Sequence, residues 1–283
     1  MRLRDELVCR LEPWELKLVP TSYDVVGDIA IIRVPESLEH RSEIVARAIM
    51  RVDKHIRTVL RQASPISGDF RLRELGFVAG ERKTETVHKE FGCLFKVDLK
   101  QSYFSPRLSY ERMRIATKVK PFELVVNMFA GVGCFSTIIA KHSKARKVYS
   151  IDINPAAIYY HKENMRLNRA EGTIEPILGD AKEIIEGRLR IVADRVLMPL
   201  PEKAYEYLEY ARSALKPQGG WIHYYGFEHA DKGEDPVEGM KEKVSQKLRH
   251  ICCRFEIPSG RIIRATGPRW YQIVLDISIL QNS

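Results

Sequence analysis

Apolar and polar positions follow two patterns in the first hundred residues. The run SYDVVGDIAIIRV at residues 22–34 is β-branched and alternating, which predicts a strand, whereas residues 37–50 place apolar side chains at helical spacing and predict a helix. Further strands are expected at residues 55–61, 70–75 and 86–99. The last of these runs bends at Phe91 and Gly92, as a hairpin does. Together these elements predict a small α+β unit.

The pattern changes after a helix expected at residues 107–118, which Pro121 ends because the residue before a proline disfavours helical backbone. Short runs of buried type then alternate with helical stretches, at residues 123–129, 147–153, 173–178, 194–200 and 221–225. This alternation is typical of a parallel sheet covered on both faces. Residues 251–257 and 270–280 are expected to close the sheet as an edge pair, and residues 226–240 to form a polar loop.

The predicted fold class is therefore α/β, a mainly parallel sheet with a smaller N-terminal α+β domain. The expected divisions are an N-terminal extension at residues 1–20, the small domain at 21–105 and the domain of the parallel sheet at 106–283. Both domains are long enough to bury a core of their own.

Composition narrows the class of protein. Of the 283 residues, 45% are hydrophobic and 29% are charged, which is typical of a folded chain and excludes disorder as its main state. No apolar run is long enough for a membrane span or a signal peptide, so we expect a cytoplasmic protein. Five cysteines without CxxC spacing predict reduced thiols: Cys9, Cys93, Cys134, Cys252 and Cys253. The eight histidines show no paired ligand spacing, so no metal is predicted.

The chain carries 46 Lys and Arg against 37 Asp and Glu, a net charge of +9. A basic chain suits a polyanionic partner, but the total alone is weak evidence. The stretch from Arg57 to Arg114 is dense in cations, which would follow a phosphate backbone if they share one face of the fold. The alternative is that they are solvated strand and helix edges.

A candidate nucleotide-type site follows the run ELVVNMF, where Gly131-Val132-Gly133 joins a buried strand to a helix. Ser136 replaces the third glycine of the dinucleotide pattern and no phosphate-binding lysine follows, which disfavours a pyrophosphate ligand. The next two strands end in Asp152 and Asp180. An acid at the first position can accept hydrogen bonds from ribose hydroxyls, and an acid at the second can face an adenine amino group.

In these three loops the chain resembles the class I S-adenosylmethionine-dependent methyltransferases. The resemblance implies S-adenosylmethionine as cofactor, with its amino-acid part at Gly131 and Gly133, its ribose at Asp152 and its adenine at Asp180. The full set of implied cofactor residues is Asn127, Phe129, Gly131, Gly133, Asp152, Ile153, Asp180, Met198 and Pro199. Many relatives have an acid where this chain has Asn127, near the amino group of the cofactor. The alternative for Asp152 and Asp180 is a helix cap.

Five longer motifs narrow the resemblance: FRLRELGFVAGERKTETVHKE at 70–90, SYFSPRLSYERMRIA at 102–116, NMFAGVGCFS at 127–136, IDINPAAI at 151–158 and DRVLMPLPEKA at 194–204. In the same order they resemble the archaeal and eukaryotic tRNA (guanine-N1) methyltransferases that act at position 37. The resemblance covers about residues 20–280. That family has an additional N-terminal domain that binds the tRNA body, and we expect this chain to begin after it.

Methylation at guanine N1 requires a base for the N1 proton and a cationic donor for the charge that develops on O6. By resemblance these roles fall to Glu111 and Arg71. Arg71 and Arg73 are expected to alternate with apolar residues on a strand and to share one face. The alternative for Glu111 is an exposed partner of Arg114 on a helix.

The resemblance also implies contacts to the substrate, from Arg71, Tyr103, Arg107 and Pro201. Tyr103 suits stacking on an extruded base, since the target nucleotide must leave its neighbours before the methyl donor reaches it. Its alternative is an aromatic side chain of the core. Pro201 suits a rigid wall beside a flat base, and its alternative is a plain strand terminator. Pro199 stands where some relatives have asparagine.

The sequence therefore predicts S-adenosylmethionine-dependent methylation of N1 of guanosine 37 in tRNA, by a chain expected to be a monomer that binds the anticodon region. Three alternatives stay open. Two are enzymes of the same fold, an aminocarboxypropyl transferase and a methyltransferase of a wybutosine precursor. The third is a non-catalytic RNA-binding protein with a decayed cofactor pocket.

Overall fold

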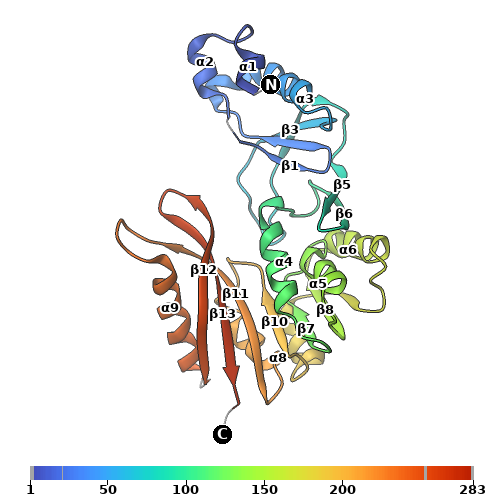
Figure 1. Ribbon diagram of the computed structural model, residues 1–283, viewed down its shortest axis with the longest axis vertical. Helices are drawn as coiled ribbons and strands as arrows, with labels where there is room; N and C mark the ends of the chain where they lie inside the picture. Colours follow the sequence, from blue (N-terminus) through green and yellow to red (C-terminus); the bar gives the residue numbers. More distant parts are fainter. Residues whose placement is uncertain (1–2, 21, 252–253, 282–283) are drawn as a thin grey trace. The chain divides into compact units, whose positions relative to one another are not determined.

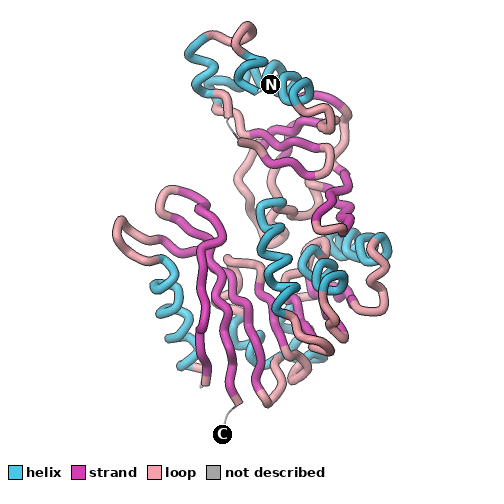
Figure 2. The backbone as a smooth tube through the Cα atoms, viewed as in Figure 1, coloured by secondary structure: helices cyan, strands magenta, loops and turns pink. Residues whose placement is uncertain are grey.

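The structure, a computed structural model, describes residues 3–20, 22–251 and 254–281. The chain forms two compact units, Met1–Arg107 and Leu108–Ser283 (Figures 1 and 2). Cys252 and Cys253, interpreted above as reduced thiols, lie outside the described residues. None of the described helices is both long and apolar enough to cross a lipid bilayer.

The first unit contains a four-stranded sheet in the order β1-β2-β3-β4. Its strands are β1 (Asp24–Val26), β2 (Ile29–Ile32), β3 (Thr58–Gln62) and β4 (Leu75–Gly80). Its helical segments are α1 (Leu3–Leu7), α2 (Pro13–Leu18), the 3₁₀ turn η1 (Glu36–Arg41) and α3 (Ser42–Val52). The apolar face of α3, with Val45 and Ile49, packs in one core with Ile32 and Val59 of the sheet. Leu7 of α1 lies in the same core.

The expected hairpin at residues 86–99 is present as β5 (Glu85–Glu90) and β6 (Cys93–Asp98). Phe91 and Gly92 both have positive φ, 47° and 74°, and this pair of left-handed residues makes the tight turn of a twisted hairpin. Every residue of β5 therefore pairs with one of β6 without a bulge.

Three predictions for local structure are wrong. Residues 22–34 form a hairpin instead of one strand, because Gly27 (φ 54°) turns the chain between β1 and β2. Residues 70–75 are mostly a turn: Arg71 has a φ of 54° and its N–H bonds to the carbonyl of Gly68, so Arg71 and Arg73 do not alternate on a strand. Residues 226–240 are not one loop, because a strand continues to His229 and a helix begins at Pro236.

The second unit has a seven-stranded sheet in the order β12-β13-β11-β10-β7-β8-β9. Its strands are β7 (Leu124–Asn127), β8 (Lys147–Asp152), β9 (Ile174–Leu178), β10 (Arg195–Met198), β11 (Gly219–His229), β12 (Phe255–Gly267) and β13 (Trp270–Leu280). Neighbours from β9 to β11 pair in parallel, and β13 pairs antiparallel with both β11 and β12. The predicted α/β fold with a mainly parallel sheet and a closing edge pair is confirmed.

Helices lie on both faces of this sheet (Figure 1). They are α4 (Ser109–Lys118), α5 (Cys134–His142), α6 (Pro155–Leu167), α7 (Ala181–Ile184) with the π turn η3 (Ile185–Leu189), α8 (Leu208–Ala214) and α9 (Pro236–His250); a 3₁₀ turn, η2 (Pro106–Leu108), precedes α4. One sheet face is apolar, and there Val126, Val196 and Ile222 pack in one core with Leu208 of α8 and Val244 of α9.

The opposite face carries several polar side chains. They lie in line across the sheet because residues directly paired across strands point to the same side. At one level of the sheet the paired residues run from Ser150 through Asn127, Leu197 and His223 to Asp276. Two residues earlier on β10, Arg195 also points to this face and is only 2% exposed. We call Arg195, His223 and Asp276 the polar row.

Four hydrogen bonds hold the guanidinium of Arg195. Its Nε and Nη2 donate to the two oxygens of Glu123 at 2.7 and 3.0 Å, and Nη2 also donates to the carbonyl of Lys118 at 2.8 Å. Its Nη1 lies 2.6 Å from Nε2 of His223. Buried charges persist only when paired in this way.

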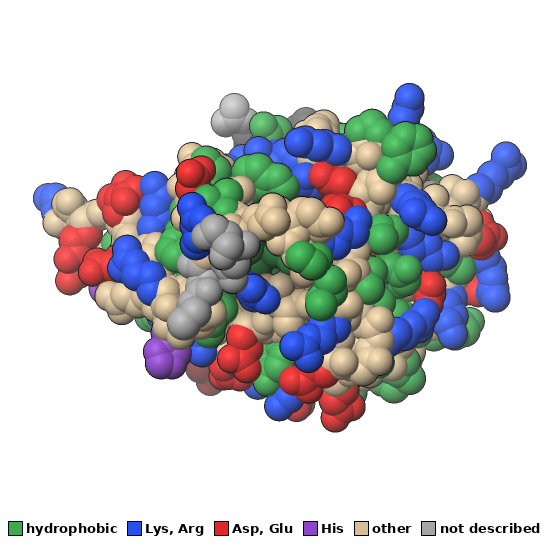
Figure 3. Space-filling view, turned by 90° about the horizontal axis from the view of Figure 1, so that it is seen from below, with side chains coloured by type: hydrophobic (Ala, Val, Ile, Leu, Met, Phe, Trp, Pro, Cys, Tyr) green, Lys and Arg blue, Asp and Glu red, His purple; other side chains and the backbone are tan. Residues whose placement is uncertain are grey.

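Positively charged side chains are mixed with other kinds of side chain on one face of the protein. On the face drawn in Figure 3, Lys and Arg side chains lie among Asp, Glu and hydrophobic side chains. That face therefore shows no continuous basic patch of the kind that follows a phosphate backbone.

Replacing Glu123 by alanine is expected to lower the free energy of unfolding by about 3 kcal/mol, because it leaves the charge of Arg195 buried without its counter-ion. Urea unfolding followed by circular dichroism measures the loss. Lys216→Ala is the matched control, since Lys216 pairs with Asp194 at 2.6 Å but is 32% exposed, and such pairs contribute about 0–1 kcal/mol. Equal losses in the two variants would contradict the role given to the pair.

Candidate active site

The order of the strands fixes where a ligand can bind. The order reverses between β7 and β10, and in open α/β sheets the carboxyl ends of the strands at such a point form the ligand crevice. The strands β7 and β10 end at Asn127 and Met198, and the loops that follow contain Gly131, Gly133, Pro199 and Pro201. Met198 and Pro201 are buried, whereas Pro199 is half-buried.

Both glycines of the loop adopt left-handed backbone, and the second leaves no room for a side chain. Gly131 and Gly133 have φ values of 55° and 87°, and Gly133 is the residue that precedes α5. A Cβ on Gly133 would lie 2.2 Å from Cδ2 of His161, so no side chain fits there. Asn164, also on α6, donates to the carbonyl of Val132 at 2.9 Å. Helix α6 therefore supports the loop through two side chains.

Asp152 lies where the sequence places it, at the end of β8. Its Oδ2 accepts the N–H of Gly131 at 2.6 Å and its Oδ1 the N–H of Asn154 at 2.9 Å. Burial raises the pKa of Asp152, and these two hydrogen bonds only partly oppose the rise. Asn154, not Asp152, caps α6, since its side chain accepts the N–H of Ala156. Asp152 thus binds the glycine loop and keeps acceptor capacity for a further donor.

Asp180 does serve as a helix cap. Its Oδ1 accepts the N–H of Lys182 at 2.7 Å, and its Oδ2 accepts the hydroxyl of Tyr207 at 2.8 Å. Burial and this bond to Asp180 raise the pKa of Tyr207. Phe129 meets Tyr207 edge-on, with ring centroids 5.4 Å apart, and Ile153 is 46% exposed. Apolar and carboxylate groups of this kind suit a flat heterocycle.

Asn127 is fully buried and faces the polar side of the sheet. Its Nδ2 donates to Oγ of Ser136 at 3.1 Å, and Ser136 also accepts the hydroxyl of Ser150 at 2.7 Å. Its Oδ1 has no hydrogen-bond partner among the residues that the structure describes. A buried acceptor without a donor is costly, so this oxygen fits the ammonium group of a bound amino acid moiety.

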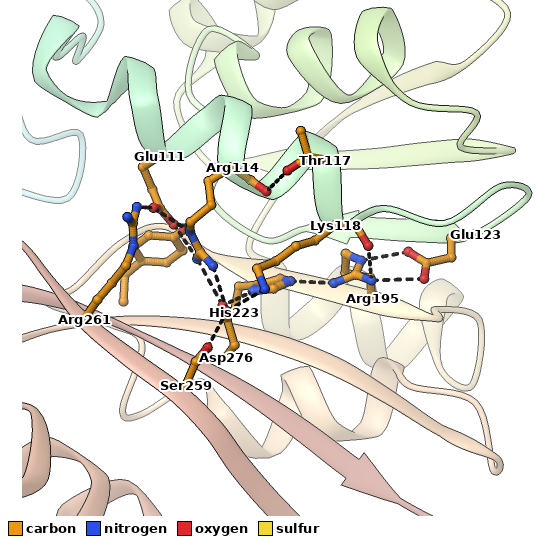
Figure 4. A network of polar contacts seen from close by, with 11 residues as sticks. Glu111, Arg114, Thr117, Lys118, Glu123, Arg195, His223, Ser259, Arg261 and Asp276 are labelled. Carbon is orange, nitrogen blue, oxygen red and sulfur yellow. Dashed lines mark hydrogen bonds and ion pairs between the residues drawn. The ribbon is translucent and has the colours of Figure 1, made fainter.

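Glu111 is 1% exposed in the first turn of α4, so its alternative as an exposed helix residue is wrong, although its pair with Arg114 exists. Arg114 donates through Nε and Nη2 at 2.9 and 2.7 Å, and the hydroxyl of Tyr225 donates at 2.7 Å. Arg261 of β12 donates to the remaining position (Figure 4). These four hydrogen bonds occupy the lone-pair sites of one carboxylate.

Register places Glu111 at the crevice edge of the sheet. Tyr224 pairs with Met198, the last residue of β10, so Tyr225 lies one residue beyond it. The ring of Tyr225 meets Phe135, in the first turn of α5, edge-on at 5.9 Å. Glu111 is therefore joined to the helix that begins at the glycine loop through a single tyrosine. Burial and the contact with Glu111 raise the pKa of Tyr225, which keeps its hydroxyl a donor.

Arg114 connects Glu111 to the polar row. Arg114 donates to both oxygens of Asp276 at 2.7 and 3.0 Å, and Asp276 lies 2.6 Å from Nδ1 of His223 (Figure 4). Burial would raise the pKa of Asp276, but hydrogen bonds from His223 and Arg114 outweigh it and lower that pKa. Burial lowers the pKa of His223. Because Arg195 donates to Nε2, the neutral imidazole carries its proton on Nδ1.

The remaining predicted residues lie in the first unit. The guanidinium of Arg71 lies 4.2 Å from the centroid of the Tyr103 ring, and Arg107 pairs with Asp24 at 2.7 Å. Burial lowers the pKa of Arg73, and the nearby Asp24 only partly opposes this shift. Arg71 and Glu111, predicted to act on one base, thus belong to different units.

Sequence reasoning missed Tyr225, Arg261 and Asp276. For Asp276 a signal existed, since it is a lone acid within the apolar run IVLDISIL. For Tyr225 and Arg261 none did, because only the strand register brings them to Glu111. No cluster of His, Cys, Asp or Glu among the described residues could hold a metal ion.

Strand order, glycine loop and the acids after β8 and β9 together define the class I methyltransferase fold. A family model described as the TRM5/TYW2 methyltransferase domain matches residues 86–255, and one described as the TYW2 N-terminal domain matches residues 3–84. The chain belongs to the TRM5/TYW2 family and is a methyltransferase or a related transferase. S-adenosylmethionine, the cofactor that the resemblance to class I methyltransferases implies, is confirmed as the cofactor of this family.

Relatives with different reactions are similar to this chain. The tRNA (guanine(37)-N(1))-methyltransferase Trm5b of Pyrococcus abyssi is 43% identical over 94% of this chain and 78% of its own length, and its crystal structure has a TM-score of 0.85 over 95% and 78%. The tRNA 4-demethylwyosine(37)-methyltransferase Taw21 of Saccharolobus solfataricus is 38% identical over 90% and 92%. M. jannaschii TYW2, solved in complex with AdoMet, is 28% identical, with a TM-score of 0.70 over 92% and 100%.

The buried imidazole of His161 makes a prediction for stability. Burial lowers its pKa to about 3, and neither ring nitrogen has a hydrogen-bond partner among the described residues. As pH falls from about 6.5 toward 3, the unfolded chain binds a proton that the folded chain does not, so stability is lost in that window. When the pH is lowered from 7 to 5, the free energy of unfolding of His161→Leu should therefore fall by about 2 kcal/mol less than that of the unmodified chain. Urea titrations of both proteins at pH 7 and pH 5 measure these free energies. An equal fall in the two proteins would contradict the prediction.

Proposed function

We propose that the chain transfers the methyl group of S-adenosylmethionine to N1 of guanosine 37 in tRNA. One observation carries the proposal: the carboxylate of Glu111 is buried at the crevice edge of the sheet, and Tyr225 joins it to the first turn of α5, the helix that begins at the glycine loop. A base at that place suits removal of a ring proton beside a bound methyl donor. The similarity to Trm5b over most of both chains supports the same reaction.

The cofactor fits the residues of the second unit. The backbone of Gly131 and Gly133 would lie against its amino-acid part, and the unpartnered Oδ1 of Asn127 would accept its ammonium group. Asp152 would accept a ribose hydroxyl. Phe129, Ile153, Asp180, Met198 and Pro199 would surround the adenine and the sulfonium. When bound, S-adenosylmethionine supplies an electrophilic methyl group.

In the proposed reaction Glu111 takes the N1 proton of the guanine. The electron pair of that N–H bond is delocalised toward O6, where Arg71 would donate a hydrogen bond to the developing charge. Tyr103, stacked under Arg71, would support the guanidinium or the base, and Arg107 and Pro201 would contact the nucleotide. Arg114, fixed by Asp276, keeps the carboxylate of Glu111 oriented.

A second candidate function is methyl or aminocarboxypropyl transfer to a wybutosine precursor at position 37. Two observations favour it. The N-terminal family model that matches residues 3–84 is that of TYW2, and the relative Taw21 acts on 4-demethylwyosine by its name. Pro199 offers no side-chain amide beside the acceptor base, so the base edge would be recognised by backbone groups and pocket shape.

The two candidates are separated by S-adenosylmethionine labelled differently in its methyl and carboxyl carbons. Methyl label that enters unmodified tRNA with guanosine 37, but not an adenosine 37 variant, supports the first proposal. Carboxyl label in the RNA indicates aminocarboxypropyl transfer. Methyl label only in tRNA that carries 4-demethylwyosine supports the second candidate and contradicts the first.

Glu111→Gln is expected to lower the rate of methyl transfer about 10²–10⁴-fold, because the amide cannot take the N1 proton. The dissociation constant of S-adenosylmethionine should stay within about twofold, since the glycine loop and Asp152 are untouched. Glu163→Gln is the matched control, because Glu163 forms an i,i+3 pair with Arg166 on α6. Full turnover by Glu111→Gln would remove Glu111 from the mechanism.

A further inference from the structure

Glu111 cannot accept a substrate proton in the arrangement that the structure shows. Four donors already fill its two oxygens, from Arg114 (twice), Tyr225 and Arg261. One donor must therefore leave before a base can bind against the carboxylate. The identity of that donor follows from what else holds each of the three side chains.

Two of the three donors are fixed. Arg114 makes two further hydrogen bonds to Asp276, and its side chain is 14% exposed. Tyr225 is 1% exposed, with its ring packed against Phe135. Removing either from Glu111 would break additional contacts in the core. Neither is therefore the group that moves.

Arg261 is held much more loosely. It lies on the edge strand β12, between two irregularities in the pairing with β13, and its side chain is 35% exposed. Its Nε is buried without a hydrogen-bond partner among the described residues. Among the described residues its guanidinium also lies 5.3 Å from the centroid of the Tyr110 ring, and Tyr110 is itself 71% exposed. Arg261 thus has an unused donor and an open side toward solvent.

We propose that Arg261 binds a backbone phosphate of the target nucleotide and by doing so releases Glu111 to act as the base. This inference rests on the proposed function. An arginine exchanges one carboxylate for a phosphate at little cost, since both accept its planar donors in the same fork geometry. The phosphate would also satisfy the unpartnered Nε. Tyr110, beside it, offers an exposed ring on which an unstacked base can lie.

The test is a double-mutant cycle of tRNA affinity that combines one substitution in the protein with one modification of the RNA. Arg261→Ala is expected to weaken tRNA binding about tenfold and to reduce the slope of log Kd against log salt by about 1. The loss should appear in KM for tRNA, with kcat within about threefold. A tRNA ligated from synthetic halves, with a neutral methylphosphonate on either side of nucleotide 37, should weaken binding to the unmodified protein by a similar factor at one of the two positions.

Non-additivity decides the result. If Arg261 binds that phosphate, the methylphosphonate costs Arg261→Ala no further affinity. Equal losses with and without Arg261, or no loss at either methylphosphonate, would overturn the proposal. A higher dissociation constant of Arg261→Ala for S-adenosylmethionine, with unchanged tRNA binding, would also overturn the proposal. It would indicate that Arg261 binds the carboxylate of the cofactor.

Two further variants guard the interpretation. Arg264→Ala, on the same strand and bonded to Gln272 at 2.8 Å, should bind tRNA as the unmodified protein does. Arg261→Lys keeps the charge and should recover part of the affinity, which a merely misfolded edge strand would not allow. The binding cycle needs no turnover. A failure to methylate guanosine 37 would therefore count against the proposed function, while an additive cycle would count against Arg261.

Discussion

The ionic contact between Arg114 and Asp276 is the interaction on which the rest of the second unit depends. Both groups are nearly buried, and a buried charge is tolerated only when its hydrogen bonds are complete. Asp276 accepts hydrogen bonds from Arg114 and from His223, and His223 in turn accepts one from Arg195. Helix α4 is thereby fixed to three strands at once. Because Glu111 lies one turn earlier on α4, its position is determined by the same contact.

The two halves of the candidate site are built by different forces. Around the glycine loop, backbone conformation dominates: Gly131 and Gly133 adopt left-handed φ, and Asp152 bonds to the loop through a backbone N–H. Around Glu111, side-chain charge dominates, since Arg114 and Arg261 both pair with its carboxylate. Tyr225 joins them, since it donates to Glu111 and packs on the first turn of α5.

Sequence reasoning located the strands of the sheet and the loops after them, because buried parallel strands are continuous apolar runs that end in recognisable glycines and acids. It failed at local turns: Gly27 and Arg71 adopt left-handed conformations that alternation does not reveal. It named Arg114 as a partner of Glu111, but it could not find Tyr225 and Arg261, the partners that the sheet supplies. Asp276 lies 162 residues from Arg114 in sequence, and only the register of β11, β12 and β13 brings such distant side chains to one face.

The protonation states of the polar row follow from its geometry. Arg195 donates to Nε2 of His223, so the imidazole must be neutral, with its proton directed at Asp276. A protonated His223 would place a cation against Arg195, and burial already lowers its pKa. Asp276 stays ionised because His223 and Arg114 lower its pKa despite burial. The carboxylate that orients Arg114 thus keeps its charge over a wide range of pH. Support from Arg114 on that side of Glu111 leaves Arg261, whose side chain is 35% exposed, as the more loosely held partner of this carboxylate.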